Sequence, residues 1–189
     1  MLKKIGMAIL VSLLVSTHVY GDSLSLEFND DSAQVGYSHV IQQDGYGTSS
    51  LNLRGLYNDD KETKLGSLGL DFSGEPGHVP GLRFGIGGEL YGGTTDYHQD
   101  ILSLGVCGNA AFAPPTLGGL GVDGRVCYAP KIFSFMDLER LLETSVGLFY
   151  AVTPKIKIKA TYQNMDADFE HQDSRHIDEA VRVGFTAQF

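Results

Sequence analysis

Serine and histidine residues close together in the sequence are the first candidates for chemistry, because a hydroxyl beside an imidazole can act as a nucleophile. Ser38 and His39 are adjacent, so on a strand their side chains point to opposite faces. Ser174 and His176 are two residues apart but fall in an expected loop. The sequence has no Gly-x-Ser-x-Gly turn. We therefore predict that the protein is not an enzyme and has no cofactor; a lipid-modifying outer-membrane enzyme is the alternative.

Carboxylates gather near the end of the chain, where they could bind a hard cation. Asp166, Asp168 and Glu170 offer the oxygen ligands that Ca²⁺ and Mg²⁺ prefer. Their spacing does not fit an EF-hand loop, because the central glycine is missing. We predict that residues 164–175 form a solvated external loop with no bound metal. A Ca²⁺ site, or a Mg²⁺ bridge to lipopolysaccharide phosphates, is the alternative.

The two cysteines are placed to form a disulfide. Cys107 and Cys127 are equally distant from residue 117, and the Pro- and Gly-rich residues 114–119 predict a turn there. In an antiparallel hairpin the two cysteines would face each other, with Cα atoms about 4.5–5.5 Å apart, which a disulfide can span. We predict a cross-strand disulfide in an oxidising compartment, with two reduced thiols as the alternative.

Apolar and polar side chains alternate along most of the chain, which predicts β-strands. We therefore expect the candidate residues to be positioned by strands and the turns between them. Turn residues such as Asp30 and Asp59 separate the alternating segments. The ten segments are residues 23–28, 33–38, 51–57, 68–72, 82–90, 102–107, 120–128, 142–152, 156–163 and 181–189.

Charges of both signs occupy the polar positions of these segments, which face the lumen if the segments form a barrel. They are Arg54, Asp71, Arg83, Glu89, Asp123, Arg125, Lys157, Lys159 and Arg182. We expect opposite charges to pair, Arg83 with Glu89 and Asp123 with Arg125, and to close the lumen. The alternative is a narrow pore lined by Arg83, Arg125 and the two lysines.

Hydropathy excludes a helical membrane protein but not a barrel. The mean hydropathy is −0.05, and no helix-length apolar segment follows residue 21. In a barrel, alternate side chains face lipid and lumen, so the average cancels. A soluble β-sandwich would alternate too, and the end of the chain argues against it. We predict an all-β fold: a transmembrane antiparallel up-and-down β-barrel of about ten strands, with eight as the alternative.

The two ends of the chain favour a bacterial outer-membrane location. Lys3 and Lys4 precede an apolar run shorter than a membrane-spanning helix, which is typical of a secretory signal peptide. We predict that residues 1–21 are the signal peptide and that residues 22–189 form one barrel domain. Gly184, Ala187 and the terminal Phe189 resemble the C-terminal assembly signal of such barrels. Both termini would lie in the periplasm, with short turns on that side and longer loops outside.

One stretch departs from the alternation. Between residues 134 and 143, Leu138, Leu141 and Leu142 stand at helical spacing, and Ser134 with Asp137 resembles a capping box. We expect a short helix or turn here, with the irregular start of a strand as the alternative.

Charge limits the partners. Removing Lys3 and Lys4 lowers the 14 basic residues to 12 against 23 acidic ones, so the formal net charge falls from −9 to −11. Because the sequence has no basic patch, nucleic acid is not an expected partner. We expect a monomer whose partners are outer-membrane lipids, lipopolysaccharide and the barrel assembly machinery.

Several stretches resemble the YfaZ-type outer-membrane protein family. They are Tyr-Ala-Pro at 128–130, Phe-Ser-Phe-Met-Asp-Leu at 133–138, Tyr-Ala-Val-Thr-Pro at 150–154, and the closing Phe189. The resemblance covers nearly the whole mature chain. It implies an outer-membrane barrel and assigns no catalytic residues. The expected role is therefore structural or surface-interaction, with porin-like passage of small solutes as the alternative.

Overall fold

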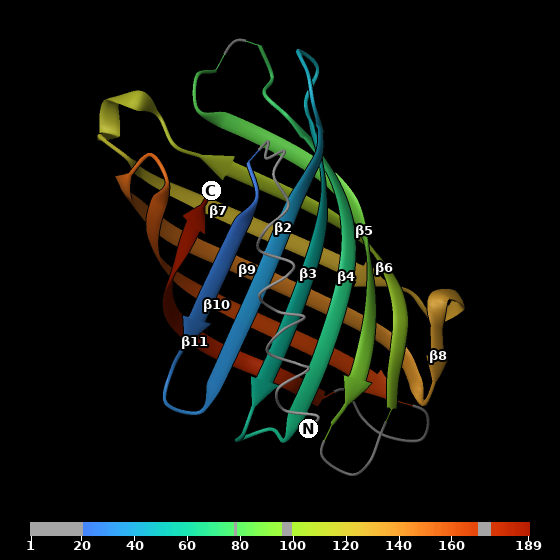
Figure 1. Ribbon diagram of the computed structural model, residues 1–189. Helices are drawn as coiled ribbons and strands as arrows, with labels where there is room; N and C mark the ends of the chain where they lie inside the picture. Colours follow the sequence, from blue (N-terminus) through green and yellow to red (C-terminus); the bar gives the residue numbers. More distant parts are fainter. Residues whose placement is uncertain (1–20, 78, 96–99, 170–174) are drawn as a thin grey trace, which may run out of the picture.

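The alternating segments form long antiparallel strands in the computed structural model, which describes residues 21–77, 79–95, 100–169 and 175–189 (Figure 1). The strands are β1 (Ser23–Phe28), β2 (Ser32–Gln43), β3 (Thr48–Asn58), β4 (Thr63–Gly74), β5 (Leu82–Thr94), β6 (Asp100–Phe112), β7 (Leu120–Ala129), β8 (Ser134–Met136), β9 (Leu138–Thr153), β10 (Ile156–Phe169) and β11 (Arg175–Gln188). Two single 3₁₀ turns, η3 (Pro115–Leu117) and η4 (Lys131–Phe133), interrupt the connections. Among the described residues, no helix is long and apolar enough to cross a membrane.

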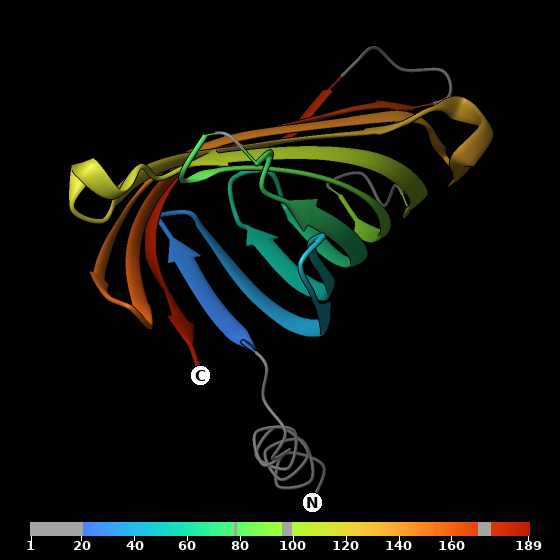
Figure 2. The same cartoon turned by 90° about the horizontal axis from the view of Figure 1, so that it is seen from above.

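Ten of these strands close into a barrel. Pairing runs from β5 back to β1, then from β1 to β11, through β10, β9 and β7 to β6, and β6 pairs with β5 again. The short β8 lies on β6 beyond the end of β7, so it adds no further wall strand. Figures 1 and 2 show the first half of the chain, blue to green, as one wall and the second half, yellow to red, as the other. The predicted ten-stranded antiparallel barrel is confirmed.

Alternation along each strand separates the two faces of the wall. On β6, Val106 is 65% exposed on the outside, whereas its neighbour Cys107 is 1% exposed on the inside. The same period of two recurs around the barrel because consecutive side chains of a strand point to opposite faces. The wall therefore presents apolar side chains outward and mostly polar ones inward.

The segment expected to form a short helix or turn contains β8, a turn at Asp137 and the start of β9, so the helix is wrong and the alternative of an irregular strand start is right. Arg140 pairs with Asp168, but the next pair is Leu138 with Phe169, so Glu139 is an extra residue in β9. Such a bulge lets two residues three apart face the same side. Leu138 and Leu141 are both buried inside the barrel for this reason. Their helix-like spacing comes from a β-bulge.

Turn lengths do not separate the two ends of the barrel as expected. The end that carries the chain termini has the connections 44–47, 75–81, 113–119 and 154–155. The opposite end has 29–31, 59–62, 95–99, 130–137 and 170–174. The predicted long loop over residues 164–175 is largely strand, because β10 continues to Phe169. The pairing of β10 with β11 continues to Ala167, past the point where the apolar alternation ends.

Local hydrogen bonds stabilise the end of the barrel at which the chain termini lie. The Asp44 carboxylate accepts the backbone N–H groups of Tyr46 at 2.8 Å and Gly47 at 3.1 Å, and these bonds lower the pKa of Asp44. The Phe189 N–H donates to the carbonyl oxygen of Asp22 at 2.9 Å. The two ends of the described chain thus meet where β1 pairs with β11.

Candidate functional site

The lumen is the candidate site, and it is filled by apolar side chains at the end away from the termini. Leu65, Ile101 and Leu138 lie at the beginnings of strands that run from that end, while Leu56 and Phe169 lie at the ends of strands that run towards it. We call this cluster the apolar plug. Its members are Leu56, Leu65, Tyr91, Ile101, Cys107, Cys127, Ala129, Leu138, Leu141, Met165, Ala167, Phe169 and Ile177.

Below the plug, five charged side chains from five strands meet across the lumen. We call them the central network. Arg54 donates to Glu143 at 2.8 Å and to Glu89 at 2.9 Å. Arg125 donates to Asp71 and to Glu89, each at 2.8 Å. Because both guanidinium groups bridge two carboxylates, the network ties β3, β4, β5, β7 and β9 together.

Neutral side chains complete the hydrogen bonding of this network. The Tyr91 hydroxyl donates to Glu143 at 2.7 Å, and the Gln163 amide donates to the other oxygen of the same carboxylate at 3.1 Å. Ser67 donates to Glu89. Buried charges are tolerated only when such partners replace water. The network is therefore a built structural element of the lumen.

A second polar group lies beside the central network, since Arg182 donates to Gln163 at 3.4 Å. Arg182 is 1% exposed and forms an ion pair with the fully buried Asp178. Its Nε donates to the Ser32 hydroxyl at 2.7 Å, and Asn58 donates to Asp178 at 2.7 Å. These bonds connect β11 with β2 and β3 through the lumen.

The predicted disulfide is present. Cys107 and Cys127 are directly paired in the β6–β7 hairpin, with Cα atoms 4.1 Å apart and both side chains in the lumen. Both are buried members of the apolar plug, and the Arg125 Nε lies 3.2 Å from the Cys127 sulfur. The disulfide therefore joins the plug to the central network.

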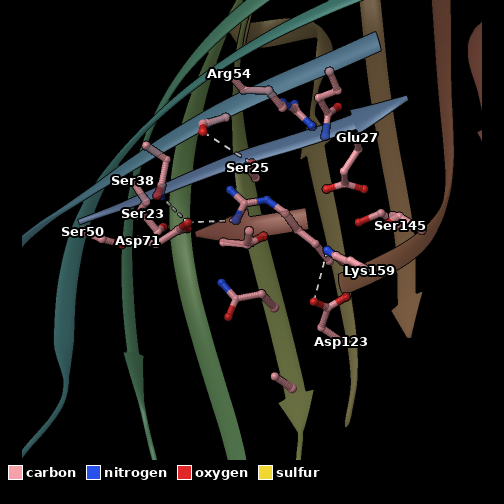
Figure 3. A pocket seen from close by; sticks show the side chains of 18 of the residues that line it. Ser23, Ser25, Glu27, Ser38, Ser50, Arg54, Asp71, Asp123, Ser145 and Lys159 are labelled. Atoms are coloured by element: carbon pink, nitrogen blue, oxygen red, sulfur yellow. Dashed lines mark hydrogen bonds and ion pairs between the residues drawn. The ribbon is translucent and has the colours of Figure 1, made fainter. Parts of the chain in front are cut away.

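Towards the termini the lumen opens into two adjoining cavities of about 440 and 260 Å³. The larger cavity lies beside the central network, where the Lys159 ammonium pairs with Asp123 at 3.1 Å (Figure 3). Arg83, Lys155 and Lys157 line the smaller cavity, which lies at the mouth of the barrel. The lumen thus combines an apolar, filled end with a polar end that contains cavities.

All nine charges predicted from parity point into the lumen, but their pairing differs from the expectation. Arg83 donates to Ser73 at 3.4 Å and does not pair with Glu89. Asp123 pairs with Lys159 rather than with Arg125. Arg125 instead reaches across the closed lumen to Asp71 and Glu89 on β4 and β5. Sequence position alone could not show these contacts.

Three lumen residues with clear roles were missed. Glu143 was hidden in the expected helix, although it shares the parity of Ser145 and Gly147 on β9. Glu27 continues the inward parity of β1 but stands at its end. Tyr91 was overlooked because an aromatic side chain at an inward position was not anticipated. The inward parity of the predicted segments already includes Glu27 and Glu143, and extending the segment 82–90 by one residue includes Tyr91.

The acidic candidates near the end of the chain lie on the outer face of the barrel. Asp168 pairs with Arg140 at 2.6 Å, and Asp166 pairs with His176. Glu170 lies outside the described residues. The two described carboxylates each have a basic partner, so the structure gathers no acidic cluster here from the part of the chain it describes.

The serine–histidine candidates do not come together either. Ser38 faces the lumen, while His39 is outside, with its Nδ1 2.7 Å from Asp22. Ser174 lies outside the described residues, so its placement beside His176 is not described. Gly184 does allow the close approach of strands, because a Cβ there would lie 1.9 Å from the Leu26 carbonyl oxygen. The recognition of Gly184, Ala187 and Phe189 in assembly stays a prediction, as does the signal peptide, most of which falls on residues that are not described.

Comparisons with known proteins add information on the fold. No family model matches the chain, and no curated protein matches its sequence, so none supports the YfaZ-type resemblance. One similar solved structure, described as "Unveiling the Mechanism Behind the in-meso Crystallization of Membrane Proteins", has a TM-score of 0.50 and 10% identity over 91% of this chain and 83% of that chain. Another, "KdgM porin", has a TM-score of 0.43 and 10% identity over 90% of this chain and 99% of that chain. At this identity the first likeness concerns the fold alone, and it agrees with the closed antiparallel β-barrel described above.

Proposed function

We propose that the chain is a non-enzymatic bacterial outer-membrane β-barrel, with a lumen closed by its own side chains and a structural or surface-interaction role. The observation that carries the proposal is the apolar outer face of the barrel. Ile86 is 70% exposed, Val106 65% and Val146 63%, although each lies in the middle part of a strand. A continuous face of this kind indicates contact with another apolar medium rather than with water.

The height of the apolar face supports a membrane as that medium. On β6 the outward side chains from Leu102 to Phe112 are apolar or glycine, and this stretch extends about 34 Å along the strand. A tilt of about 45° reduces that length to about 24 Å, close to the ~25 Å apolar band of outer-membrane barrels.

The apolar face also ends at a defined level. Tyr162 pairs with Val146 and Val181, whereas the next outward residue of β10, Asn164, pairs with Thr144 and Glu179. The change from apolar to polar therefore occurs at the same level on three neighbouring strands. The Tyr162 hydroxyl donates to Glu179 at 3.1 Å, as suits an aromatic residue at a membrane interface.

The apolar plug and the central network support a closed lumen. Planar bilayers containing the purified barrel test this directly, with insertion verified by its heat-dependent migration in SDS gels. We expect no stepwise conductance from the wild type. The plug variant Tyr91→Ala/Leu141→Ala/Phe169→Ala should conduct more often, because it removes three large lumen side chains. Reproducible ohmic conductance of the wild type would contradict the closed lumen.

A second candidate, a narrow porin-like passage, is supported by the two cavities and the basic side chains at the mouth. It predicts wild-type conductance whose preference for anions falls in Lys157→Glu, because Lys157 lines the smaller cavity.

Membership of the YfaZ-type family remains part of the proposal and depends on the sequence motifs alone.

A further inference from the structure

Glu27 is a buried lumen carboxylate that the protein itself does not neutralise. The residue is 6% exposed, it lines the larger cavity, and its Oε2 has no hydrogen-bond partner among the described residues. No ion pair within the described part of the chain reaches it, and no dashed line touches it in Figure 3. An isolated buried charge is costly unless a ligand or water compensates it.

The charged donor closest in register to Glu27 is already used, because Arg182, two residues from Gly184 on β11, donates to Asp178. Gln34 lies directly opposite on β2, and its Oε1 is buried without a partner as well. On the other side stands Gly184, which adds no side-chain donor and whose missing Cβ lets β11 approach β1 closely. Lys159, which pairs with Gly184 from the next strand, is itself paired with Asp123. Two unpartnered oxygens therefore face a cavity that contains space for a donor.

The adjoining, smaller cavity carries only basic charges in its lining. Arg83, Lys155 and Lys157 line it together with neutral residues, and no carboxylate appears in its lining. None of these three has a carboxylate partner among the described residues; Lys157 instead lies 5.2 Å from the centre of the Phe149 ring. We call these three residues the cationic mouth.

The two cavities share part of their lining, and Glu27 and Lys157 lie two residues apart in level along the strands. Both cavities are lined by Ser23, Ser38, Ser50, Ser73 and Thr186. Thr186 pairs with Lys157 and with Ser25, which is two residues before Glu27. The level of Lys157 is therefore about 7 Å from that of Glu27 along the strands.

We propose that the cavities bind a small zwitterion, with its ammonium group at Glu27 and Gln34 and its acidic group at the cationic mouth. A simple cation would leave the mouth unpaired, and a simple anion would leave Glu27 unpaired. One molecule with both charges, separated by roughly 7 Å or more, satisfies both cavities at once. Such a ligand has the chemistry of an ω-amino acid or a short peptide.

Binding of 6-aminohexanoate to the detergent-solubilised barrel, measured by isothermal titration calorimetry, tests the proposal. Two analogues each lack one charge: 6-amino-1-hexanol has no carboxylate, and 6-hydroxyhexanoate has no ammonium. We expect the wild type to bind the zwitterion at least tenfold more tightly than either analogue. No saturable binding, or equal binding of a singly charged analogue, would overturn the proposal without any variant being made.

Variants then assign the two ends of the ligand. Glu27→Gln should weaken zwitterion binding at least tenfold and remove the preference over 6-hydroxyhexanoate. Lys157→Gln should remove the preference over 6-amino-1-hexanol. The control Glu75→Gln changes an exposed carboxylate outside both cavities and should bind like the wild type. Unchanged binding in Glu27→Gln would refute the site. Because these measurements need neither a bilayer nor conductance, their failure leaves the proposed membrane location and closed lumen unaffected.

Discussion

Charged residues in this lumen differ in how many ion-pair and hydrogen-bond partners the protein provides for them. Arg54 and Arg125 each bridge two carboxylates, and Arg182 has partners on three strands. Glu27, which lines the same cavity as Arg54 and Arg125, has none among the described residues. The first group holds the walls together, whereas Glu27 is the residue best suited to meet something from outside.

The buried Arg182 should contribute strongly to stability. Arg182→Met leaves Asp178 buried and charged with only Asn58 beside it, so we expect a loss of about 3–5 kcal/mol in the free energy of unfolding. Urea titration of the barrel in lipid or detergent measures this loss. Lys61→Met is the matched control, because its pair with Asp60 is solvent-exposed and should be worth less than about 1 kcal/mol. Equal stability of Arg182→Met and wild type would show that the group is not structural.

The alternating sequence pattern predicts to which face of the wall each of these side chains points, but it does not predict their partners. Arg125 could be placed in the lumen because it alternates with Val126, yet its carboxylates come from β4 and β5, more than thirty residues away. Such contacts depend on the curvature and register of the closed wall, which alternation does not encode. The Cys107–Cys127 pair was predictable because its geometry is set within one hairpin.

Whole strands follow the alternation wherever the pleat is regular, and the departures occur at bulges. The shift beside Glu139 in β9 brought Leu138 and Leu141 to one side, which imitates a helical period. A second shift, in the β10–β11 pairing next to Met165, places both Ile177 and Asp178 inside. Because one extra residue reverses parity, patterns read across a bulge give the wrong element or the wrong face.

The outward face of β6 gives a test of what surrounds the barrel. We expect Val106→Arg to destabilise the barrel in lipid by about 2–4 kcal/mol, since it would place a charge near the middle of the bilayer. Thr144→Arg lies in the polar row beside Asn164 and should cost about 0–1 kcal/mol. Reversible unfolding from lipid vesicles measures both. Equal costs, or a more stable Val106→Arg, would indicate that this face meets water.

At the scale of the whole molecule the barrel has two unlike ends. The apolar plug fills the lumen at the end away from the termini, and polar cavities open towards the terminal end. Mean hydropathy conceals this arrangement, because apolar side chains outside balance polar ones inside. The closed wall, the filled lumen and the apolar outer face together explain how a chain of middling mean hydropathy could have the proposed bilayer location.

The most direct test of that account uses the absence of tryptophan from the chain. Single tryptophans introduced as Ile86→Trp on the outer face and Ser50→Trp in the cavities report their surroundings by fluorescence quenching after refolding into vesicles. We predict that brominated acyl chains quench the tryptophan at position 86, while aqueous acrylamide quenches the one at position 50. Quenching of position 86 by acrylamide but not by brominated lipid would contradict a membrane-embedded barrel.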